Sequence, residues 1–185
     1  MKKNIYLLFA ILCAGLLTAC GEDNEDIYAK YEDWRVLNEQ AFNVIKNNSE
    51  YTELKTLSNR GSIYYKVLKG SGEDAGHILY TSTVKVYYTG SFTVDSKDYN
   101  ISAGKVFDSA EYPDSRPATF NVRNLVEGFT TALQFMKEGD RWEVYIPWYL
   151  AYGDTGSMNQ VTGGYSILPF SMLKFEIEVD EIVKK

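Results

Sequence analysis

The side chains that most often perform covalent or metal chemistry are scarce in this sequence. It contains a single histidine, His77, and two cysteines, Cys13 and Cys20, which both lie near the N-terminus. A Ser-His-Asp site would have to form around His77, which has no nucleophile signature near it. A metal site would lack a second histidine and a further thiol. We therefore expect neither a metal nor a cofactor, and we interpret His77 as a solvated loop residue.

The glycine-rich segments and the charge pattern do not indicate a nucleotide or nucleic-acid ligand. Gly70, Gly72 and Gly76 lack the Lys-Ser/Thr ending of a phosphate-binding loop, and Gly163-Gly164 has no strand-to-helix context. The 25 acidic and 19 basic residues give a formal net charge of -6, and no segment concentrates lysine and arginine. We therefore interpret these glycines as turn residues and expect no nucleic-acid partner.

A pocket lined by apolar and aromatic side chains is the kind of site that remains. Aromatic residues make up 15% of the sequence and include 15 tyrosines, against four prolines. This composition favours strands with half-buried phenol rings. With 185 residues and 45% hydrophobic content, the chain has room for one domain with its own core and a smaller appendage.

Hydrophobic periodicity predicts four strands and one helix that would build such a pocket. The strands are expected near 63–68, 83–88, 141–146 and 173–179. Helical spacing is shared by Leu125, Phe129, Ala132, Leu133 and Met136. We predict an α+β domain in which a curved antiparallel sheet buries its inner face against this helix, near 124–136.

The N-terminal sequence resembles a bacterial lipoprotein signal. Lys2 and Lys3 precede a charge-free run, and Leu17-Thr18-Ala19-Cys20 resembles a lipobox, which implies cleavage after residue 19 and lipidation of Cys20. We expect a signal peptide over 1–19, an acidic tether over 20–26, and a membrane partner reached through the lipid. This places the protein in the bacterial cell envelope, at the outer membrane, on its periplasmic or its cell-surface face. The acidic tether resembles export signals of surface lipoproteins in the Bacteroides group.

A further amphipathic helix is predicted over residues 27–45, followed by a polar connector over 50–61, so that residues 27–61 form an N-terminal helix and connector. The apolar positions follow steps of three and four at Ile27, Tyr31, Trp34, Leu37, Ala41, Val44 and Ile45. The polar face is not enriched in basic residues, which favours packing against protein over a membrane surface. Its partner is either the chain's own domain or a second copy in a homodimer.

An ordered series of short motifs resembles the FKBP-type peptidyl-prolyl cis-trans isomerase family. The motifs are Val86-Tyr87-Tyr88-Thr89-Gly90, Gly104-Lys105-Val106-Phe107-Asp108-Ser109, Pro117-Ala118-Thr119-Phe120, Val126-Glu127-Gly128-Phe129, Gly139-Asp140, Ile146-Pro147, Leu150-Ala151-Tyr152-Gly153 and Ile167-Leu168-Pro169. Each motif is weak alone, but their common order spans most of the chain after Ser62. The resemblance implies an isomerase domain over 62–185, built as a five-stranded antiparallel half-barrel wrapped around one helix, with the N-terminal helix as an addition.

The same resemblance implies the residues of a proline-binding pocket. The catalytic positions would be Tyr88, Phe107, Asp108 and Tyr152. The other substrate-binding positions would be Val126, Phe129, Ile167, Phe175 and Phe120. In the family, the tyrosine that matches Tyr152 donates a hydrogen bond to a substrate carbonyl. The implied partners are proline-containing polypeptides, and the implied function is isomerisation of X-Pro bonds during the folding of exported proteins.

The sequence departs from the family around this pocket. Phe129 stands where the family usually has tryptophan, Ala118 replaces an aromatic residue, and Asp108 lacks the matching basic partner. Two long loops, 91–106 and 154–168, border the expected site. These departures leave an alternative function open, namely a non-catalytic surface lipoprotein of the same fold that binds a partner protein or a glycan through its long loops.

Overall fold

The structure, a computed structural model, describes residues 26–72 and 75–184. The expected signal peptide, the lipidation site Cys20 and the tether up to residue 25 lie outside the described residues. A short helix, α1 (Ile27–Lys30), belongs to a unit that ends at Lys30, and none of its residues is buried. The other described elements belong to a second unit, which begins at Tyr31. Within the described ranges, no helix has both the length and the apolar character needed to cross a bilayer.

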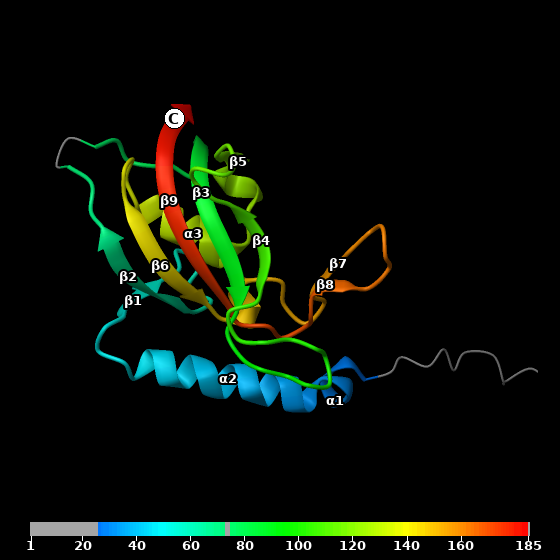
Figure 1. The fold of residues 1–185 in the computed structure, drawn as a ribbon. Helices are drawn as coiled ribbons and strands as arrows, with labels where there is room; N and C mark the ends of the chain where they lie inside the picture. The colour runs from blue at the N-terminus through cyan, green and yellow to red at the C-terminus, as the bar shows by residue number, and fades with distance from the viewer. Residues whose placement is uncertain (1–25, 73–74, 185) are drawn as a thin grey trace, which may run out of the picture. The chain divides into compact units, whose positions relative to one another are not determined.

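Seven described strands of the second unit form one antiparallel sheet (Figure 1). They are β1 (Thr52–Lys55), β2 (Ser62–Lys69), β3 (Thr83–Phe92), β4 (Val106–Ala110), β5 (Ala118–Asn121), β6 (Arg141–Ile146) and β9 (Leu173–Lys184). Their order is β1-β2-β6-β9-β3-β4, and β5 also pairs with β3. The long strand β9 is central because it pairs with β6 on one side and with β3 on the other. A separate two-stranded sheet contains β7 (Ser157–Met158) and β8 (Tyr165–Ile167).

Helix α3 (Glu127–Phe135) lies against one face of this sheet (Figure 1). Its buried side chains include Phe129, Ala132 and Leu133. Residues of β3 and β6 that alternate toward this face are also buried, namely Val84, Val86, Val144 and Ile146. A Cβ atom at Gly128 would overlap the side chain of Ile146, so the close approach of α3 to β6 depends on this glycine.

These elements confirm the predicted α+β class, with an antiparallel sheet around one helix and a further helix near the N-terminus. The sheet has seven strands rather than five, because it includes β1 and because β4 and β5 are two separate strands that both pair with β3. Strand β1 falls within the connector predicted over 50–61. Its sequence Thr-Glu-Leu-Lys has one apolar residue, and its side chains are mostly exposed, so periodicity carries no signal for it.

Helix α2 (Glu32–Lys46) lies along one end of the sheet (Figure 1). Its buried residues are Trp34, Asn38 and Phe42. The predicted inward orientation of Leu37 and Val44 is wrong, since these side chains are 42% and 68% exposed. The helix instead turns a polar residue, Asn38, toward the protein interior, and hydrophobic spacing could not anticipate this rotation.

The buried amide of Asn38 has a hydrogen-bond partner for both its oxygen and its nitrogen, which explains its place in the interface. Its Oδ1 atom accepts a hydrogen bond from the Met172 backbone N–H at 2.8 Å, and its Nδ2 atom donates to the Trp34 carbonyl at 2.8 Å. Near the other end of α2, the Phe42 ring packs edge to face on Tyr64, with 5.5 Å between the ring centroids. The helix therefore packs against its own domain.

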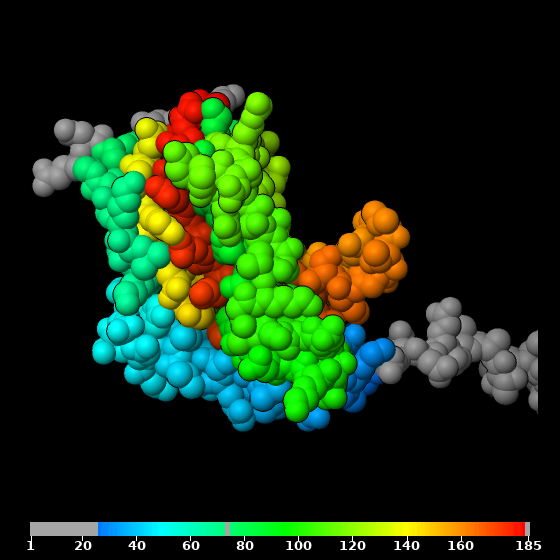
Figure 2. All heavy atoms as spheres, viewed as in Figure 1, coloured from blue at the N-terminus to red at the C-terminus, as the bar shows by residue number. Residues whose placement is uncertain are grey.

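The two long loops also have defined structure. Residues 93–105 connect β3 to β4 and cover part of α2 in the space-filling view (Figure 2). The other loop contains the β7–β8 sheet, which projects from the surface of the second unit (Figure 2). Val161, in the turn between these two strands, is 94% exposed.

Candidate functional site

Five aromatic rings from five elements form one cluster on the α3 side of the sheet. They belong to Tyr88 of β3, Phe107 of β4, Phe120 of β5, Phe129 of α3 and Phe175 of β9. Phe129 is the centre, with centroid distances of 5.1 Å to Phe175, 6.2 Å to Tyr88 and 6.3 Å to Phe120. The Phe107 ring lies 5.7 Å from that of Phe175. The structure thus brings together five of the nine predicted pocket residues as an apolar surface.

The absence of a side chain at Gly90 lets two of these rings meet. Gly90 lies in β3 opposite Phe175 of β9 and Asp108 of β4. A Cβ atom built on Gly90 would lie 2.6 Å from the Phe107 Cζ atom and 2.8 Å from the Phe175 Cε1 atom. Ordinary carbon contacts are about 3.5–4.0 Å, so any larger residue would push the two rings apart. Strand β3 therefore contributes a ring at Tyr88 and the space for two others at Gly90.

A polar group sits beside the aromatic cluster. The Tyr88 hydroxyl donates a hydrogen bond to the Asp108 Oδ2 atom at 2.6 Å. Burial raises the pKa of Tyr88 above its ordinary value, and the hydrogen bond to Asp108 raises it further. Asp108 is exposed and has no ion pair within the described ranges. The carboxylate is therefore held by a phenol rather than by a cation.

Tyr152 completes this polar edge. It follows the short turn η2 (Trp148–Leu150), and its backbone carbonyl accepts a hydrogen bond from the Gly156 N–H at 3.1 Å. Burial raises the pKa of the Tyr152 hydroxyl, and the negative charge of nearby Asp108 adds to the increase. Among the hydrogen bonds of the described residues, none uses this hydroxyl. At neutral pH it is therefore a protonated donor beside the Tyr88–Asp108 pair.

The two remaining predicted lining residues come from separate segments. Val126 is half-buried at the N-terminal end of α3, where its carbonyl accepts from the Thr130 N–H at 3.0 Å. Ile167 ends β8 and is 4% exposed. Val126 is fixed relative to Phe129 by the same helix, whereas Ile167 depends on the loop that leads to β9. Their role in lining the site stays a prediction.

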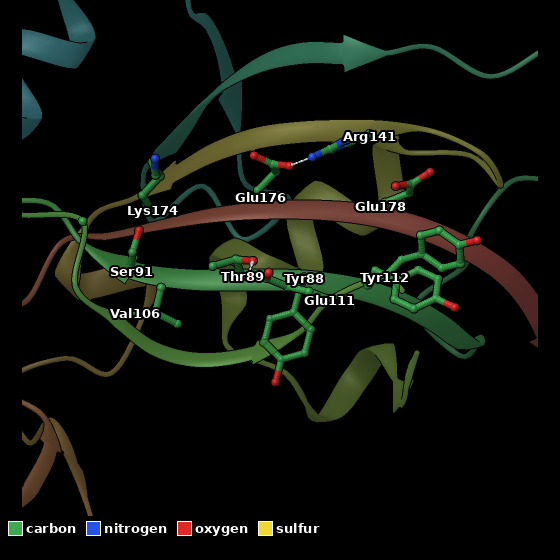
Figure 3. Close-up of a pocket in the computed structure, with 12 residues that line it drawn as sticks. Tyr88, Thr89, Ser91, Val106, Glu111, Tyr112, Arg141, Lys174, Glu176 and Glu178 are labelled. Atoms are coloured by element: carbon green, nitrogen blue, oxygen red, sulfur yellow. Dashed lines mark hydrogen bonds and ion pairs between the residues drawn. The ribbon is translucent and has the colours of Figure 1, made fainter. Parts of the chain in front are cut away.

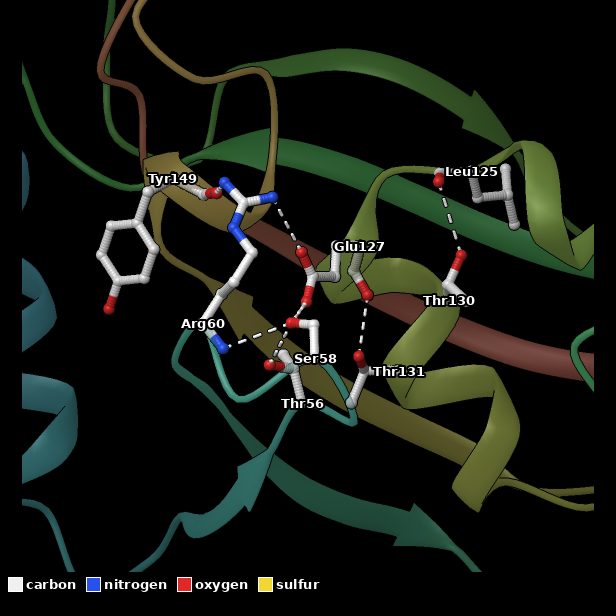
Figure 4. A network of polar contacts seen from close by, with 8 residues as sticks. All are labelled: Thr56, Ser58, Arg60, Leu125, Glu127, Thr130, Thr131 and Tyr149. Carbon is white, nitrogen blue, oxygen red and sulfur yellow. Dashed lines mark hydrogen bonds and ion pairs between the residues drawn. The ribbon is translucent and has the colours of Figure 1, made fainter.

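The start of α3 is fixed by a polar network from the β1–β2 turn (Figure 4). Glu127 accepts a hydrogen bond from the Ser58 hydroxyl, and its Oε2 atom lies 3.1 Å from the Arg60 Nη1 atom. The Thr131 hydroxyl donates to the Glu127 carbonyl at 2.8 Å, and the Thr130 hydroxyl donates to the Val122 carbonyl at 2.8 Å. A carboxylate in the first turn also suits the helix dipole. This network anchors the helix that carries Phe129.

A groove of about 440 Å³ lies on the opposite face of the sheet (Figure 3). Its lining residues Thr89 and Glu176 alternate along their strands with Gly90 and Phe175, which face the aromatic cluster. Four of its five charged lining residues form ion pairs, Arg141 with Glu176, Lys174 with Glu143, and Glu178 with Lys69. The fifth, Glu111, accepts a hydrogen bond from the Thr89 hydroxyl. This groove thus lies mainly on the other side of the sheet from the predicted site and shares Tyr88 with it, and most of its charged groups are paired.

Comparison with known proteins identifies the family. A model of FKBP-type peptidyl-prolyl cis-trans isomerases matches residues 78–180, which is more than half of the chain. The chain belongs to the FKBP family. The matched range contains every residue of the aromatic cluster, together with Asp108 and Tyr152. It leaves out β1, β2 and α2, although α2 packs against the same domain.

Individual relatives agree with this assignment. A macrophage infectivity potentiator from Trypanosoma cruzi is 38% identical over 122 residues, which are 66% of this chain and 53% of the relative. An FKBP-type 22 kDa peptidyl-prolyl cis-trans isomerase from Escherichia coli (strain K12) is 41% identical over 103 residues, which are 56% of this chain and 42% of the relative. The chain spans about half the length of the curated relatives it matches.

Solved structures have the same fold. A peptidyl-prolyl cis-trans isomerase from Pseudomonas syringae pv. tomato str. DC3000 aligns with a TM-score of 0.64 at 24% identity, over 84% of this chain and 96% of that one. FkpA from Escherichia coli aligns with a TM-score of 0.61 at 26% identity, over 84% of this chain and 64% of that one. Both confirm the predicted FKBP-like architecture.

Two residues of the site, Phe92 and Gly90, were not predicted from the sequence. The Phe92 ring lies 5.3 Å from that of Phe107, yet the sequence placed residue 92 in a long loop. The alternation of β3 in fact continues through Val84, Val86 and Tyr88 to Phe92, but Gly90 has no side chain and interrupts the apolar pattern. Gly90 belongs to one of the family motifs, but the sequence did not show what it contacts. A glycine inside a strand indicates that another group packs closely against the backbone there, and it does not identify that group.

Proposed function

We propose that the protein catalyses cis-trans isomerisation of X-Pro peptide bonds. The observation that carries this proposal is the five-ring cluster around Phe129, with the Tyr152 hydroxyl and the Tyr88–Asp108 pair at its edge. Such a surface combines an apolar seat for a proline ring with a single oriented donor for a carbonyl. Membership of the FKBP family supports the same activity.

The chemistry requires twisting of an amide rather than bond cleavage. The barrier is about 20 kcal/mol, because resonance is lost as the C–N bond rotates. The planar amide is more dipolar than the twisted one, so a surface that excludes water favours the twisted form. Phe129, Phe175 and Phe107 would supply this surface, with Val126, Phe120 and Ile167 as further lining residues.

The polar groups orient the substrate. Tyr152 would donate to the substrate carbonyl, because its hydroxyl is protonated at neutral pH. Asp108 would act in two ways: it fixes the Tyr88 phenol by accepting its hydrogen bond, and its charge opposes ionisation of Tyr152. A phenylalanine at position 129 keeps the apolar seat and removes only the indole donor, which is compatible with turnover.

A protease-free isomerisation assay on the full chain, purified in detergent, tests this proposal. We expect the wild type to accelerate isomerisation of a proline-containing peptide. Tyr152→Phe should lower kcat/KM about tenfold, because one hydrogen bond at the transition state is worth about 1–1.5 kcal/mol. Tyr112→Phe is the matched control, since Tyr112 is 75% exposed and lines the outer groove. A folded wild type without catalysis would contradict the proposal.

The same experiment separates the isomerase from the non-catalytic alternative. A binding module of this fold would bind a proline-containing peptide, a partner protein or a glycan without accelerating isomerisation. Loss of binding on Phe129→Ala without any wild-type turnover would favour that alternative.

We also propose that the protein is lipid-anchored in the cell envelope and assists the folding of exported proteins. The lipobox at Cys20 and the preceding apolar run support the anchor. A relative from Legionella longbeachae, 41% identical over 92 residues, 49% of this chain and 34% of the relative, is named outer membrane protein MIP. Cys20→Ser should release the protein from membranes, whereas Cys13→Ser should not. An unmodified thiol at Cys20 in the native protein, detected by mass spectrometry, would contradict the anchor.

We propose that α2 acts within a monomer, which is one of the two arrangements that its amphipathic sequence left open, rather than in a homodimer. The burial of Tyr31, Trp34 and Phe42 within the chain supports this, since these three rings are not available to a second copy, although Leu37 and Val44 are exposed. Sedimentation of the full chain in detergent should give one mass, that of a monomer, over a wide concentration range. A concentration-dependent dimer that dissociates on Leu37→Glu would contradict the proposal.

A further inference from the structure

The N-terminal half of α2 contacts the loops on both sides of the candidate pocket. The first loop, residues 93–105, connects β3 to β4 and leads into Phe107. The second loop, residues 151–172, contains Tyr152 and Ile167 and leads into β9. Two aromatic residues of the helix region, Tyr31 and Trp34, are buried at 5% and 1% exposure between these loops.

Aromatic side chains of the first loop and of β3 connect α2 to the candidate pocket. Tyr99 of this loop lies 5.6 Å from Tyr31 and 5.9 Å from Trp34, measured between ring centroids. Trp34 also contacts Phe92 at 6.5 Å, and Phe92 in turn contacts Phe107 at 5.3 Å. A continuous series of rings therefore joins α2 to one predicted wall of the pocket.

Contacts with the second loop are equally direct. The Tyr31 ring meets Tyr165 of β8 edge to face at 6.1 Å. The Trp34 Nε1–H donates to the Ser171 hydroxyl at 3.2 Å, and that hydroxyl donates to the Leu168 carbonyl at 2.8 Å. Ile167, the predicted lining residue, thus lies between two segments that are held by α2.

The C-terminal half of α2 has a different set of contacts. Phe42 packs with Tyr64 of β2 and with Met172, in a cluster that also includes Tyr51 and Tyr145. Tyr64 and Tyr145 belong to the sheet, whereas Met172 is the last residue of the second loop and lies outside β7 and β8. The helix thus has one half that contacts the loops and one that contacts mainly the sheet, so the two can be perturbed separately.

We infer that Tyr31 and Trp34 are positioning residues, through which α2 holds both pocket loops in the geometry that isomerisation requires. The inference rests on the proposed function. It extends the functional unit beyond the segment matched by the family model, residues 78–180, to a helix that the sequence suggested only as a packing or dimer element. Small displacements of groups that orient a substrate are costly to rate, even when the displaced residues do not touch the substrate.

A comparison of Tyr31→Ala with Phe42→Ala, in the full chain purified in detergent, tests the inference. Each variant removes one buried ring, Tyr31→Ala from the residue that precedes α2 and Phe42→Ala from the C-terminal half of the helix. We expect Tyr31→Ala to accelerate amide hydrogen exchange in 93–105 and 157–167 and to lower kcat/KM about tenfold. Phe42→Ala should lower the thermal midpoint while it leaves loop exchange and kcat/KM close to wild type. Both variants are assayed at a temperature at which melting curves show them folded.

A conservative substitution separates positioning from general stability. Tyr31→Phe keeps the ring between Tyr99 and Tyr165 and should restore both the loop exchange rates and kcat/KM. Unchanged loop exchange in Tyr31→Ala, or an equal loss of activity in Phe42→Ala, would overturn the inference. Should the wild type itself lack isomerase activity, the proposed function would fail, while loop exchange in the variants would still decide whether α2 holds the loops.

Discussion

Substitution of Gly90 by alanine should damage the candidate site from within the sheet. The added Cβ atom would lie 2.6 Å from the Phe107 Cζ atom and 2.8 Å from the Phe175 Cε1 atom. Both rings must move by about 1 Å to restore ordinary contacts of about 3.5–4.0 Å. Overpacking of this kind costs about 1–3 kcal/mol, which corresponds to a fall of roughly 2–12 °C in Tm for a chain of this size.

The same displacement should lower activity, because Phe107 and Phe175 form part of the proposed proline seat. We expect kcat/KM to fall by about tenfold or more in the protease-free assay, at a temperature where the variant is folded. Gly70→Ala is the matched control. No atom lies within 4 Å of a Cβ atom built at Gly70, so the added methyl group meets no clash. Because alanine also lowers the conformational entropy of the unfolded chain, Tm should be unchanged or slightly raised.

A second substitution shows whether the rings are the cause. Phe107→Leu removes the atoms closest to the new methyl group, so Gly90→Ala should cost less stability in that background than in the wild type. If Gly90→Ala leaves Tm and kcat/KM at the values of Gly70→Ala, the close packing of these rings around β3 is refuted.

Three other predictions follow from the site and from α2. Phe129→Trp should raise kcat/KM if the family's indole donor improves turnover; an unchanged rate in a folded variant would show that the ring alone is sufficient. Asn38→Ala should lower the free energy of unfolding by about 1–3 kcal/mol in denaturant titrations, because the Met172 N–H loses its buried acceptor. Gln40→Ala, at an exposed position of the same helix, is the control, and an equal effect of the two substitutions would contradict this prediction. The raised pKa of Tyr88 favours its neutral form in the folded state, so its contribution to stability should be fully present below the pKa of an unfolded tyrosine, near 10, and should be lost at higher pH. In melting curves recorded against pH, Tyr88→Phe should make this loss of stability shallower.

The sequence predicted those parts of the fold in which one face is apolar throughout. Val84 and Val86 alternate as a half-buried strand requires, and Ala132 and Leu133 have helical spacing, and all four are buried. The predicted orientation of α2 was partly wrong, because the buried face of the helix includes Asn38. The side chain of Asn38 is satisfied by a hydrogen bond from Met172, a residue 134 positions away in the chain. Periodicity ranks residues by polarity and cannot register a distant partner that satisfies a buried amide.

For the candidate site, residue types were easier to predict than the supports that hold them. The family motifs include Phe107 and Tyr152, so both residues were predicted. The contacts of Tyr31 with Tyr99 and Tyr165 join three segments of the chain, and no motif contains any of these three residues. Exposed β1 gave no hydrophobic signal, yet the turn after it supplies Ser58 and Arg60 to the start of α3. Such supports come from tertiary geometry, and a single sequence does not encode them as a local pattern.

The central position of β9 has a consequence for the order in which the domain folds. Without β9, the sheet separates into one part with β1, β2 and β6 and another with β3, β4 and β5, because β9 alone joins β6 to β3. Phe175 also belongs to β9, so Phe129 lacks its nearest ring in the cluster until this strand is in place. Residues 173–184 must therefore pair with both parts before the sheet can close. Until then the two parts of the sheet are not joined, and the contacts that join them are distant in sequence, which is typical of slow folding.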